Sequence, residues 1–445
     1  MKLYGVALLA PFAATVAAYT TEFELLPYES VADDAAVVVA GDNARFTVLT
    51  SRLIRMEQAK TPGKFEDRPT LAILNRKLPV PSFTHSLSSD NATLTIKTDD
   101  ATLTYSMGQK FSKDTLSVSF GDSKKWSYGD RNDGNLLGTI KSLDELGPIS
   151  LNCTENAGTQ IHDETLHCEW GLVSRDGWSI YDDTENYCLG EGDWWDGDSN
   201  SSHNVLDADL YGFFHGSDYK GALQDFTTVG GKIAMVPRAA SGVWWTRWFD
   251  FTDGDARGVA DEYRARSFPL DVFVLDMDWH RKNSWTGYSF DNSLFPDEAQ
   301  FMAALHDEGL ILAANLHDDV GIGPWENKYD YMSKLMGTPN GTNVPFTMCT
   351  NTTYTHALED VVLGSLESSR LGGELSDGGM DFWWIDWQQG GNHGGCAGLK
   401  QNPTIWTNKA RKLRDHSFSD PCPSSSLPHP AVPVRSSLHD LFSHC

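Results

Sequence analysis

The strongest constraint on the fold is a change of rhythm near Pro237, after which short apolar segments alternate with amphipathic ones. Four apolar segments read GVWWTRWFDF, DVFVLDMDWH, LILAANLH and MDFWWIDW. Helical patterns lie between them, including PDEAQFMAALHDEG, in which Phe301 and Leu305 share one face and Gly309 provides a stop. Strands that are apolar throughout and alternate with helices predict a parallel sheet buried on both faces, as in a doubly wound fold or a barrel.

The preceding part of the chain, from about residue 20 to 235, has a different pattern of short alternating runs broken by Gly, Asn, Asp and Ser. Residues 91–107, NATLTIKTDDATLTYSM, read as two strands joined by a turn at KTDD. Repeated at short spacing, such runs predict an all-β sandwich. We therefore expect a β-sandwich domain over 19–236 and a (β/α) domain over 237–411.

The two ends of the chain read as segments outside these domains. Residues 1–18, MKLYGVALLAPFAATVAA, have a charged start, a short apolar stretch and small residues for cleavage, as in a secretory signal peptide. Residues 412–445 are rich in Pro and Ser without periodicity, which predicts an irregular tail, either flexible or foreign to the natural coding sequence.

Further features favour a secreted or luminal glycoprotein. No later run approaches the ~20 apolar residues of a membrane-spanning helix. Five Asn-x-Ser/Thr sequons are predicted glycosylation acceptors: Asn91, Asn152, Asn200, Asn340 and Asn351.

Charge and cysteine content narrow the functional classes. A net charge of −26 argues against a nucleic-acid partner, because phosphate binding needs basic patches. The seven cysteines form no CxxC or His-spaced cluster, so no zinc site is predicted. Asp276 and Asp278 form a D-x-D at a strand end, which is a weak metal signal, and we assign no metal and no cofactor.

Polar and aromatic residues follow each predicted parallel strand. They are Trp248 after the first strand, Asp276 and Asp278 after the second, Asn315 and His317 at the third, and Asp386 after the fourth. In a parallel barrel, chemistry sits at the carboxyl ends of the strands. Carboxylates accept hydrogen bonds from hydroxyls and indoles cover the apolar face of a sugar ring, so this rim suits a polyol. Glycoside cleavage with retention uses two carboxylates ~5–5.5 Å apart, and Asp386 is our candidate nucleophile.

Several ordered stretches between about 170 and 410 resemble glycoside hydrolase family 31, the α-glucosidase and α-xylosidase family. They are LVSRDGWSIYDDT, DLYGFFHGSDYKGALQDFTTVGG, VPRAASGVWWTRWFD, FPLDVFVLDMDWH and DFWWIDWQQG. The resemblance implies a galactose-mutarotase-like β-sandwich followed by a (β/α)₈ TIM barrel that acts with retention. It makes Asp386 the nucleophile and places Asp276 and Trp248 at the sugar in the −1 subsite. Asp278 and His317 are expected neighbours.

After Arg411 the chain departs from the family pattern. The family's acid/base Asp, a later His and the later barrel strands find no counterpart, so only about the first half of the barrel is expected and the acid/base stays unassigned. Proton donation to the leaving group contributes typically ~10²–10⁴-fold to the rate. We therefore expect this chain to be weakly active or inactive.

Two alternatives remain beside a retaining α-glycosidase of terminal α-glucosidic or α-xylosidic bonds. One is a non-catalytic carbohydrate-binding protein, and the other is a different (β/α) barrel glycosidase such as an α-galactosidase. The sequence leaves open glucose or xylose, the linkage, hydrolysis or transglycosylation, the disulfide connectivity and the oligomeric state.

Overall fold

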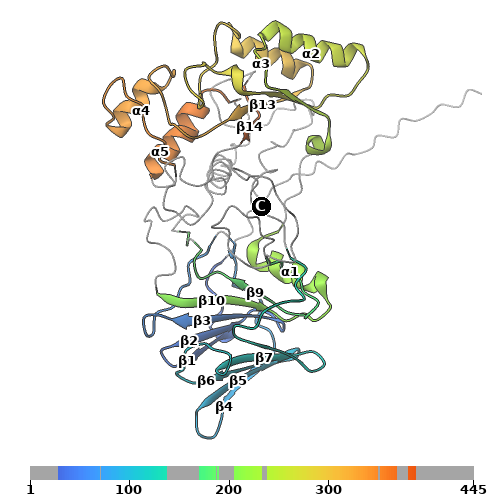
Figure 1. Cartoon of the computed structure of the whole chain (residues 1–445), viewed down its shortest axis with the longest axis vertical. Helices are drawn as coiled ribbons and strands as arrows, with labels where there is room; N and C mark the ends of the chain where they lie inside the picture. Colours follow the sequence, from blue (N-terminus) through green and yellow to red (C-terminus); the bar gives the residue numbers. More distant parts are fainter. Residues whose placement is uncertain are drawn as a thin grey trace, which may run out of the picture.

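The computed structural model describes residues 29–70, 72–137, 170–186, 188–189, 205–232, 238–348, 351–367 and 379–386. The predicted signal segment, the predicted tail and two of the five sequons, at Asn152 and Asn200, lie outside these residues. In Figure 1 two antiparallel sheets gather at one end of the long axis, and a parallel sheet with its helices gathers at the other. No helix in the described residues is long and apolar enough to cross a membrane.

The N-terminal part contains two five-stranded antiparallel sheets. The first has the order β1 (Val37–Ala40), β2 (Ala44–Val48), β3 (Leu53–Ala59), β10 (Leu206–Phe213) and β9 (Ser179–Asp182). The second has the order β4 (Phe83–Leu87), β5 (Thr93–Thr98), β6 (Ala101–Ser106), β7 (Leu116–Phe120) and β8 (Lys124–Ser127). A short 3₁₀ helix, η1 (Asp34–Ala36), precedes β1.

The predicted hairpin over residues 91–107 is confirmed. Strands β5 and β6 pair antiparallel, with Ile96 opposite Leu103. Both side chains are fully buried, whereas the alternate positions are partly exposed. The period-2 pattern therefore has a direct cause, because one face of this sheet packs against the first sheet in a shared hydrophobic cluster that includes Phe46 and Met56.

A helix that the sequence pattern did not predict, α1 (Tyr219–Gly230), covers the other face of the first sheet. Asp218 caps it by accepting a hydrogen bond from the backbone N–H of Gly221 at 3.0 Å. Val229 packs with Tyr211 and Phe213 of β10.

The parallel sheet has four strands in chain order: β11 (Trp244–Arg247), β12 (Val272–Leu275), β13 (Ile311–Leu316) and β14 (Phe382–Ile385). The accompanying helices are η2 (Arg238–Ser241), α2 (Asp253–Ala265), η3 (Met277–Trp279), α3 (Glu298–Asp307), α4 (Tyr329–Met336), α5 (Thr352–Ala357) and the π-helix η4 (Leu358–Leu363). The segment VVLGSLESSRLGG, which also carries a helical pattern, overlaps only the end of η4, and its last residues lie outside the described part of the chain.

Local signals explain where α2 and α3 begin and where α3 ends. Thr252 and Asp255 form a reciprocal capping box at the start of α2. Asp297 caps α3 through the backbone N–H of Gln300. Gly309 follows α3 with φ +84°, a left-handed conformation that favours glycine at the end of a helix.

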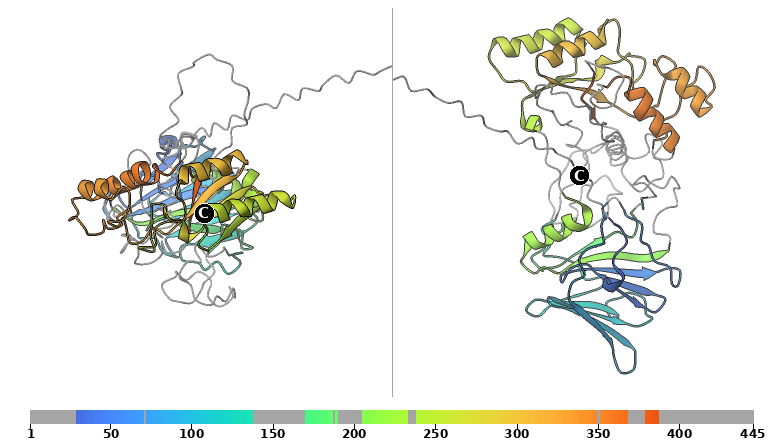
Figure 2. Two further views of the ribbon diagram at one scale, coloured as in Figure 1. Left: turned by 90° about the horizontal axis from the view of Figure 1, so that it is seen from above. Right: turned by 180° about the vertical axis from the view of Figure 1, so that it is seen from behind.

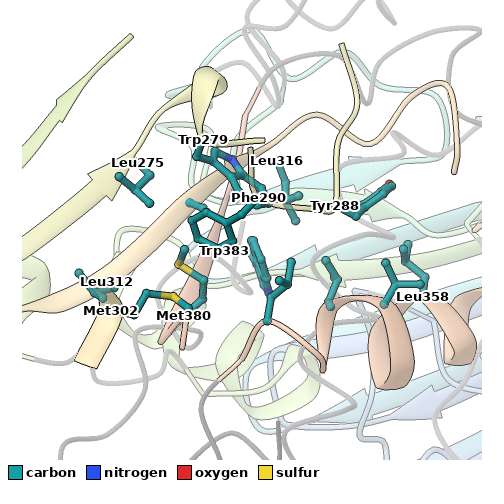
Figure 3. Close-up of a cluster of buried hydrophobic side chains, with 14 of the residues drawn as sticks. Leu275, Trp279, Tyr288, Phe290, Met302, Leu312, Leu316, Leu358, Met380 and Trp383 are labelled. Carbon is teal, nitrogen blue, oxygen red and sulfur yellow. The ribbon is translucent and has the colours of Figure 1, made fainter. Parts of the chain in front are cut away.

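The two faces of the parallel sheet are covered differently. Phe273, Leu312 and Trp383 lie on the face that packs against α2, α3 and the segments after β13 in a large core (Figure 3). Val274, Ala313 and Phe382 lie on the opposite face, in a small cluster with Trp244 and Trp384. Figure 2 shows α2 and α3 on the same side of this sheet.

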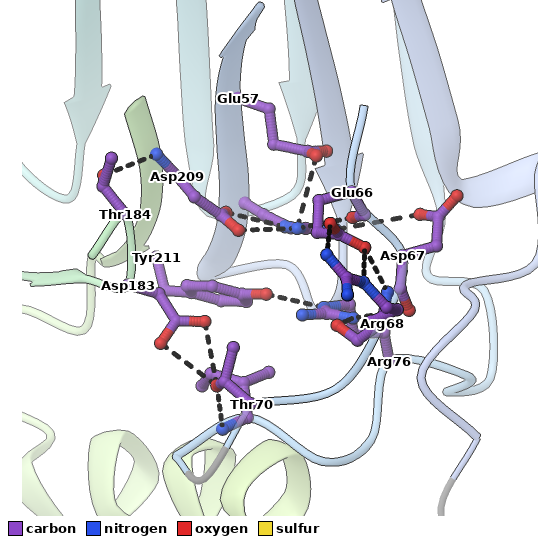
Figure 4. A network of polar contacts seen from close by, with 12 residues as sticks. Glu57, Glu66, Asp67, Arg68, Thr70, Arg76, Asp183, Thr184, Asp209 and Tyr211 are labelled. Carbon is purple, nitrogen blue, oxygen red and sulfur yellow. Dashed lines mark hydrogen bonds and ion pairs between the residues drawn. The ribbon is translucent and has the colours of Figure 1, made fainter. Parts of the chain in front are cut away.

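The first antiparallel sheet holds a buried ionic network (Figure 4). Arg55, 1% exposed, donates to both oxygens of Asp209 at 2.8 and 2.6 Å and lies 3.2 Å from Glu57. Arg45 forms a second pair with Glu57 at 2.6 Å. Because removing one partner would leave an uncompensated buried charge, this network fixes how β2, β3 and β10 align.

Asp183 lies beside this network and is fully buried. It accepts hydrogen bonds from the Thr70 hydroxyl at 3.0 Å and from the Asn186 amide at 2.5 Å. Burial, and then the nearby negative charge of Asp209, raise the pKa of the Asp183 carboxyl to about 7.

We predict that Asp183→Asn flattens the pH dependence of folding stability. An unfolded Asp titrates near pH ~3.9, so between about pH 4 and 7 the folded protein holds a proton that the unfolded chain releases. The contribution of Asp183 to the free energy of unfolding is therefore complete below about pH 4 and is lost as the pH rises through about 7. Denaturant unfolding across this range should show a larger loss in the wild type than in the variant. Asp182→Asn, at an exposed neighbour, is the control, and equal losses in wild type and Asp183→Asn would contradict the assignment.

Candidate active site

The candidate site lies at the carboxyl ends of the parallel strands. It is on the small-cluster face of the sheet, which is the face that carries Val274, Ala313 and Phe382. Side chains alternate along a strand, so Asp276 continues the face of Val274, and Asp386 continues the face of Phe382 and Trp384. On β13, Asn315 lies on the same face, two residues after Ala313. The strands register in parallel with Leu275 beside Ala314 and Leu316 beside Ile385, which brings these polar ends to one level.

Asn315 connects the two carboxylates. Its side-chain amide nitrogen donates to Asp276 at 3.0 Å and to Asp386 at 2.8 Å. Asp276 also accepts from the backbone N–H of Met277, at the start of η3. The structure thus joins the ends of β12, β13 and β14 through one side chain, whereas the sequence pattern assigned Asn315 no role beyond its place at a strand end.

Burying the Asn315 amide at this position costs folding free energy. It is 4% exposed in an otherwise apolar strand, and its carbonyl oxygen has no hydrogen-bond partner among the described residues. An unsatisfied buried acceptor costs about 1–3 kcal/mol. The carboxylates can only accept, so they require the NH₂ end of the amide and leave the carbonyl without a donor.

His317 is the second neighbour of Asp386. Its Nε2 lies 3.9 Å from the carboxylate, and its ring packs against Trp285 with centroids 4.6 Å apart. Burial lowers the pKa of His317, and the negative charge of Asp386 opposes that shift. The His317 side chain is 4% exposed and that of Asp386 is 43% exposed, so Asp386 presents an accessible carboxylate beside a buried imidazole.

Trp248 and Asp278 form a second pair at the rim. The indole N–H of Trp248 donates to Asp278 at 3.0 Å. The Trp248 ring packs edge-on against Trp285, with ring centroids 6.2 Å apart. Burial, and then a hydrogen bond with Asp250, raise the pKa of Asp278, while Lys282, 3.8 Å away, opposes this. Trp248 is 61% exposed, so a broad indole surface is open beside the carboxylates.

All five predicted site residues therefore lie in one connected group. Asp276 and Asp386 meet at Asn315, His317 lies beside Asp386, and Trp285 links His317 to Trp248 and Asp278. Asp276 and Asp278 also line one small depression whose wall is completed by Trp245, Arg247, Phe249, Phe251, Val274, Leu275, Trp279 and Phe295. The described residues contain no group of three or more His, Cys, Asp or Glu side chains that could hold a metal ion.

Three predicted glycosylation sequons fall in the described part of the chain. Asn91 and Asn340 are exposed in turns. Asn351 is partly buried and caps α5 by accepting from the backbone N–H of Tyr354 at 3.1 Å. Of the seven cysteines, Cys188 is described, and it is a buried free thiol.

Comparisons with known proteins identify the class. Residues 233–416 match the model of the glycosyl hydrolases family 31 TIM-barrel domain. The α-xylosidase of Emericella nidulans is 33% identical over 113 residues, which is 25% of this chain and 14% of that protein. The α-glucosidase 2 of Bacillus thermoamyloliquefaciens is 30% identical over 100 residues, which is 22% of this chain and 12% of that protein.

Two solved structures agree on the fold. A family 31 α-xylosidase from a soil metagenome, complexed with xylose, superposes with a TM-score of 0.55 at 13% identity, over 86% of this chain and 62% of that one. A Flavobacterium johnsoniae family 31 dextranase, complexed with glucose, gives 0.54 at 15% identity, over 86% of this chain and 52% of that one. The chain thus spans roughly half to three fifths of these structures. Residues 233–416 therefore carry a glycosyl hydrolases family 31 TIM-barrel domain, and the superposed structures share its fold.

We predict that His317 titrates below the ordinary range of histidine and that Asp386→Asn lowers its pKa further. The substitution removes the negative charge that favours the imidazolium while burial remains. An NMR titration of labelled histidines measures both effects, with assignment by His317→Gln. Asp319→Asn, which removes a carboxylate two residues along the chain from His317, is the control. An unchanged or raised His317 pKa in Asp386→Asn would contradict the contact.

Proposed function

We propose that this chain carries the nucleophile half of a retaining α-glycosidase site for terminal α-glucosidic or α-xylosidic bonds. The observation that carries the proposal is the Asp386 carboxylate, accessible at the end of β14 and held by Asn315 beside Asp276. The names of the relatives, α-xylosidase and α-glucosidase, support this substrate class.

The proposed step is a displacement at the anomeric carbon. An Asp386 oxygen forms a bond to that carbon while the bond to the leaving oxygen breaks, and the departing oxygen takes the electron pair and needs a proton. Water then attacks the same carbon from the other face and gives up a proton, and the bond to Asp386 breaks to release the carboxylate. Two inversions leave the α configuration unchanged.

The neighbouring groups take binding roles in this proposal. Asp276 accepts hydrogen bonds from sugar hydroxyls, and Trp248 offers its exposed indole face to the ring. Asp278 orients Trp248 through the indole N–H, and His317 stands behind Asp386 as a second polar neighbour. No residue of the chain is assigned to proton donation, so the departing alcohol lacks an identified acid.

The domain plan and the cellular location remain proposals too. We propose a galactose-mutarotase-like β-sandwich over 19–236, about half of a (β/α)₈ barrel over 237–411, and an irregular segment over 412–445. The two packed antiparallel sheets and the four parallel strands in chain order support the first two. We also propose export through the secretory pathway with N-linked glycans, supported by the exposed turns at Asn91 and Asn340.

The first test is covalent trapping of the nucleophile. Incubation with 5-fluoro-α-D-glucosyl fluoride, or with its xylosyl counterpart, should label the protein, because fluoride leaves without a proton. Peptide mapping should find the sugar on Asp386, and Asp386→Asn should abolish labelling. Asp381→Asn, at a carboxylate before β14 that bonds His306, is the control. A label on another residue would exclude Asp386 as the nucleophile.

The second test separates catalysis from binding. We expect alkyl α-glucosides to be cleaved about 10²–10⁴-fold more slowly than by an enzyme with an acid in place, whereas α-glucosyl fluoride should be hydrolysed readily. Both rates follow from sugar release in wild type and Asp386→Asn. A normal enzymatic rate on the alkyl glycoside would overturn the expectation of weak activity. Sugar binding by calorimetry without turnover of either substrate would favour a carbohydrate-binding protein, and preference for α-galactosyl fluoride would favour an α-galactosidase.

A further inference from the structure

The position of Asn315 raises a question that the proposed roles leave open. A strand that is otherwise apolar carries one amide, buried to 4% exposure, whose NH₂ group meets two carboxylates from the strands on either side. The contacts span 39 and 71 positions in the chain, so no local turn or cap explains them.

The surroundings leave Asn315 little freedom. Its backbone carbonyl accepts the indole N–H of the buried Trp279 at 2.9 Å, which anchors the strand end against η3. Its side-chain carbonyl has no partner among the described residues, so the amide is oriented by its two donor contacts alone. Rotating it by half a turn would point the carbonyl at two anions.

We infer that Asn315 is a positioning residue that fixes the Asp386 carboxylate for attack and holds Asp276 beside it. Two carboxylates close together disfavour each other's charge, and hydrogen bonds donated to the charged forms counter that effect. This inference rests on the proposed function, because it assigns Asn315 a role in the reactivity of Asp386.

Titratable groups around this cluster come from four elements. Asp276 follows β12, and Asp278 and His280 belong to or follow η3. His317 and Asp318 follow β13, and Asp386 follows β14. Because these groups lie together, the pH dependence of labelling reports on the whole cluster.

The test is the pH profile of labelling by 5-fluoro-α-D-glucosyl fluoride, followed by intact mass. In the wild type the rate should fall at low pH as the carboxylates protonate. Asn315→Asp adds a third carboxylate and should move this acidic limb upward by about one pH unit or more. Asn315→Ala removes both donors and should lower the maximal labelling rate about tenfold or more, with little change in the half-saturating concentration of reagent.

Asn132 supplies the matched control, because it is similarly buried at 7% exposure and donates a side-chain hydrogen bond to the carbonyl of Trp178, in the antiparallel part of the chain. In Asn132→Asp and Asn132→Ala, the acidic limb of the pH profile and the maximal labelling rate should both equal those of the wild type. Thermal unfolding establishes that each variant folds.

The outcomes separate this inference from the proposed function. Absence of any label in the wild type would overturn the proposed function and the inference with it. Labelling of the wild type on Asp386, with an unchanged acidic limb and rate in a folded Asn315 variant, would overturn the inference alone. Failure of both Asn315 variants to fold while the Asn132 variants fold would also overturn it, because the amide would then serve the sheet. If only one of the two Asn315 variants folds, its acidic limb and labelling rate alone test the inference.

Discussion

The site depends on one constraint, the register of four parallel strands. Alternation along β12, β13 and β14 sends every second side chain to the small-cluster face, where Val274, Ala313 and Phe382 are followed by polar residues. A slip of one residue in any strand would turn its polar end toward the helices. Packing of Phe273, Leu312 and Trp383 against α2 and α3 prevents such a slip, so the large core positions the site from the opposite face of the sheet.

Charged side chains lie in two contrasting environments in this chain. In the first antiparallel sheet, Arg55 and Asp209 are buried and paired, and the pair serves alignment of strands. At the ends of the parallel strands two carboxylates of like charge meet a neutral amide, and Asp386 remains accessible. An arrangement that places two anions around one amide favours chemistry over stability, because alignment of the sheet could be achieved at lower cost by apolar residues.

Much of the fold could be predicted because its signals are local. Period-2 alternation marked the hairpin of β5 and β6, and a one-face apolar pattern with the Gly309 stop marked α3. Helix α1 escaped prediction, since Asp218 and a run containing two Thr and three Gly gave a weak pattern and its burial comes from Tyr211 and Phe213 on a distant strand. The short strand β11 within GVWWTRWFDF shows that apolar letters continue past the last paired residue.

The sequence by itself determined that carboxylates follow apolar strands and that aromatic residues accompany them, because strand period and strand ends are properties of neighbouring residues. Only the tertiary structure decided which of these groups touch. Asn315 meets Asp276 and Asp386 because three strands far apart in the chain align in parallel, and Trp285 connects Trp248 with His317. Contacts of this kind depend on the packing of whole layers, and no local pattern encodes them.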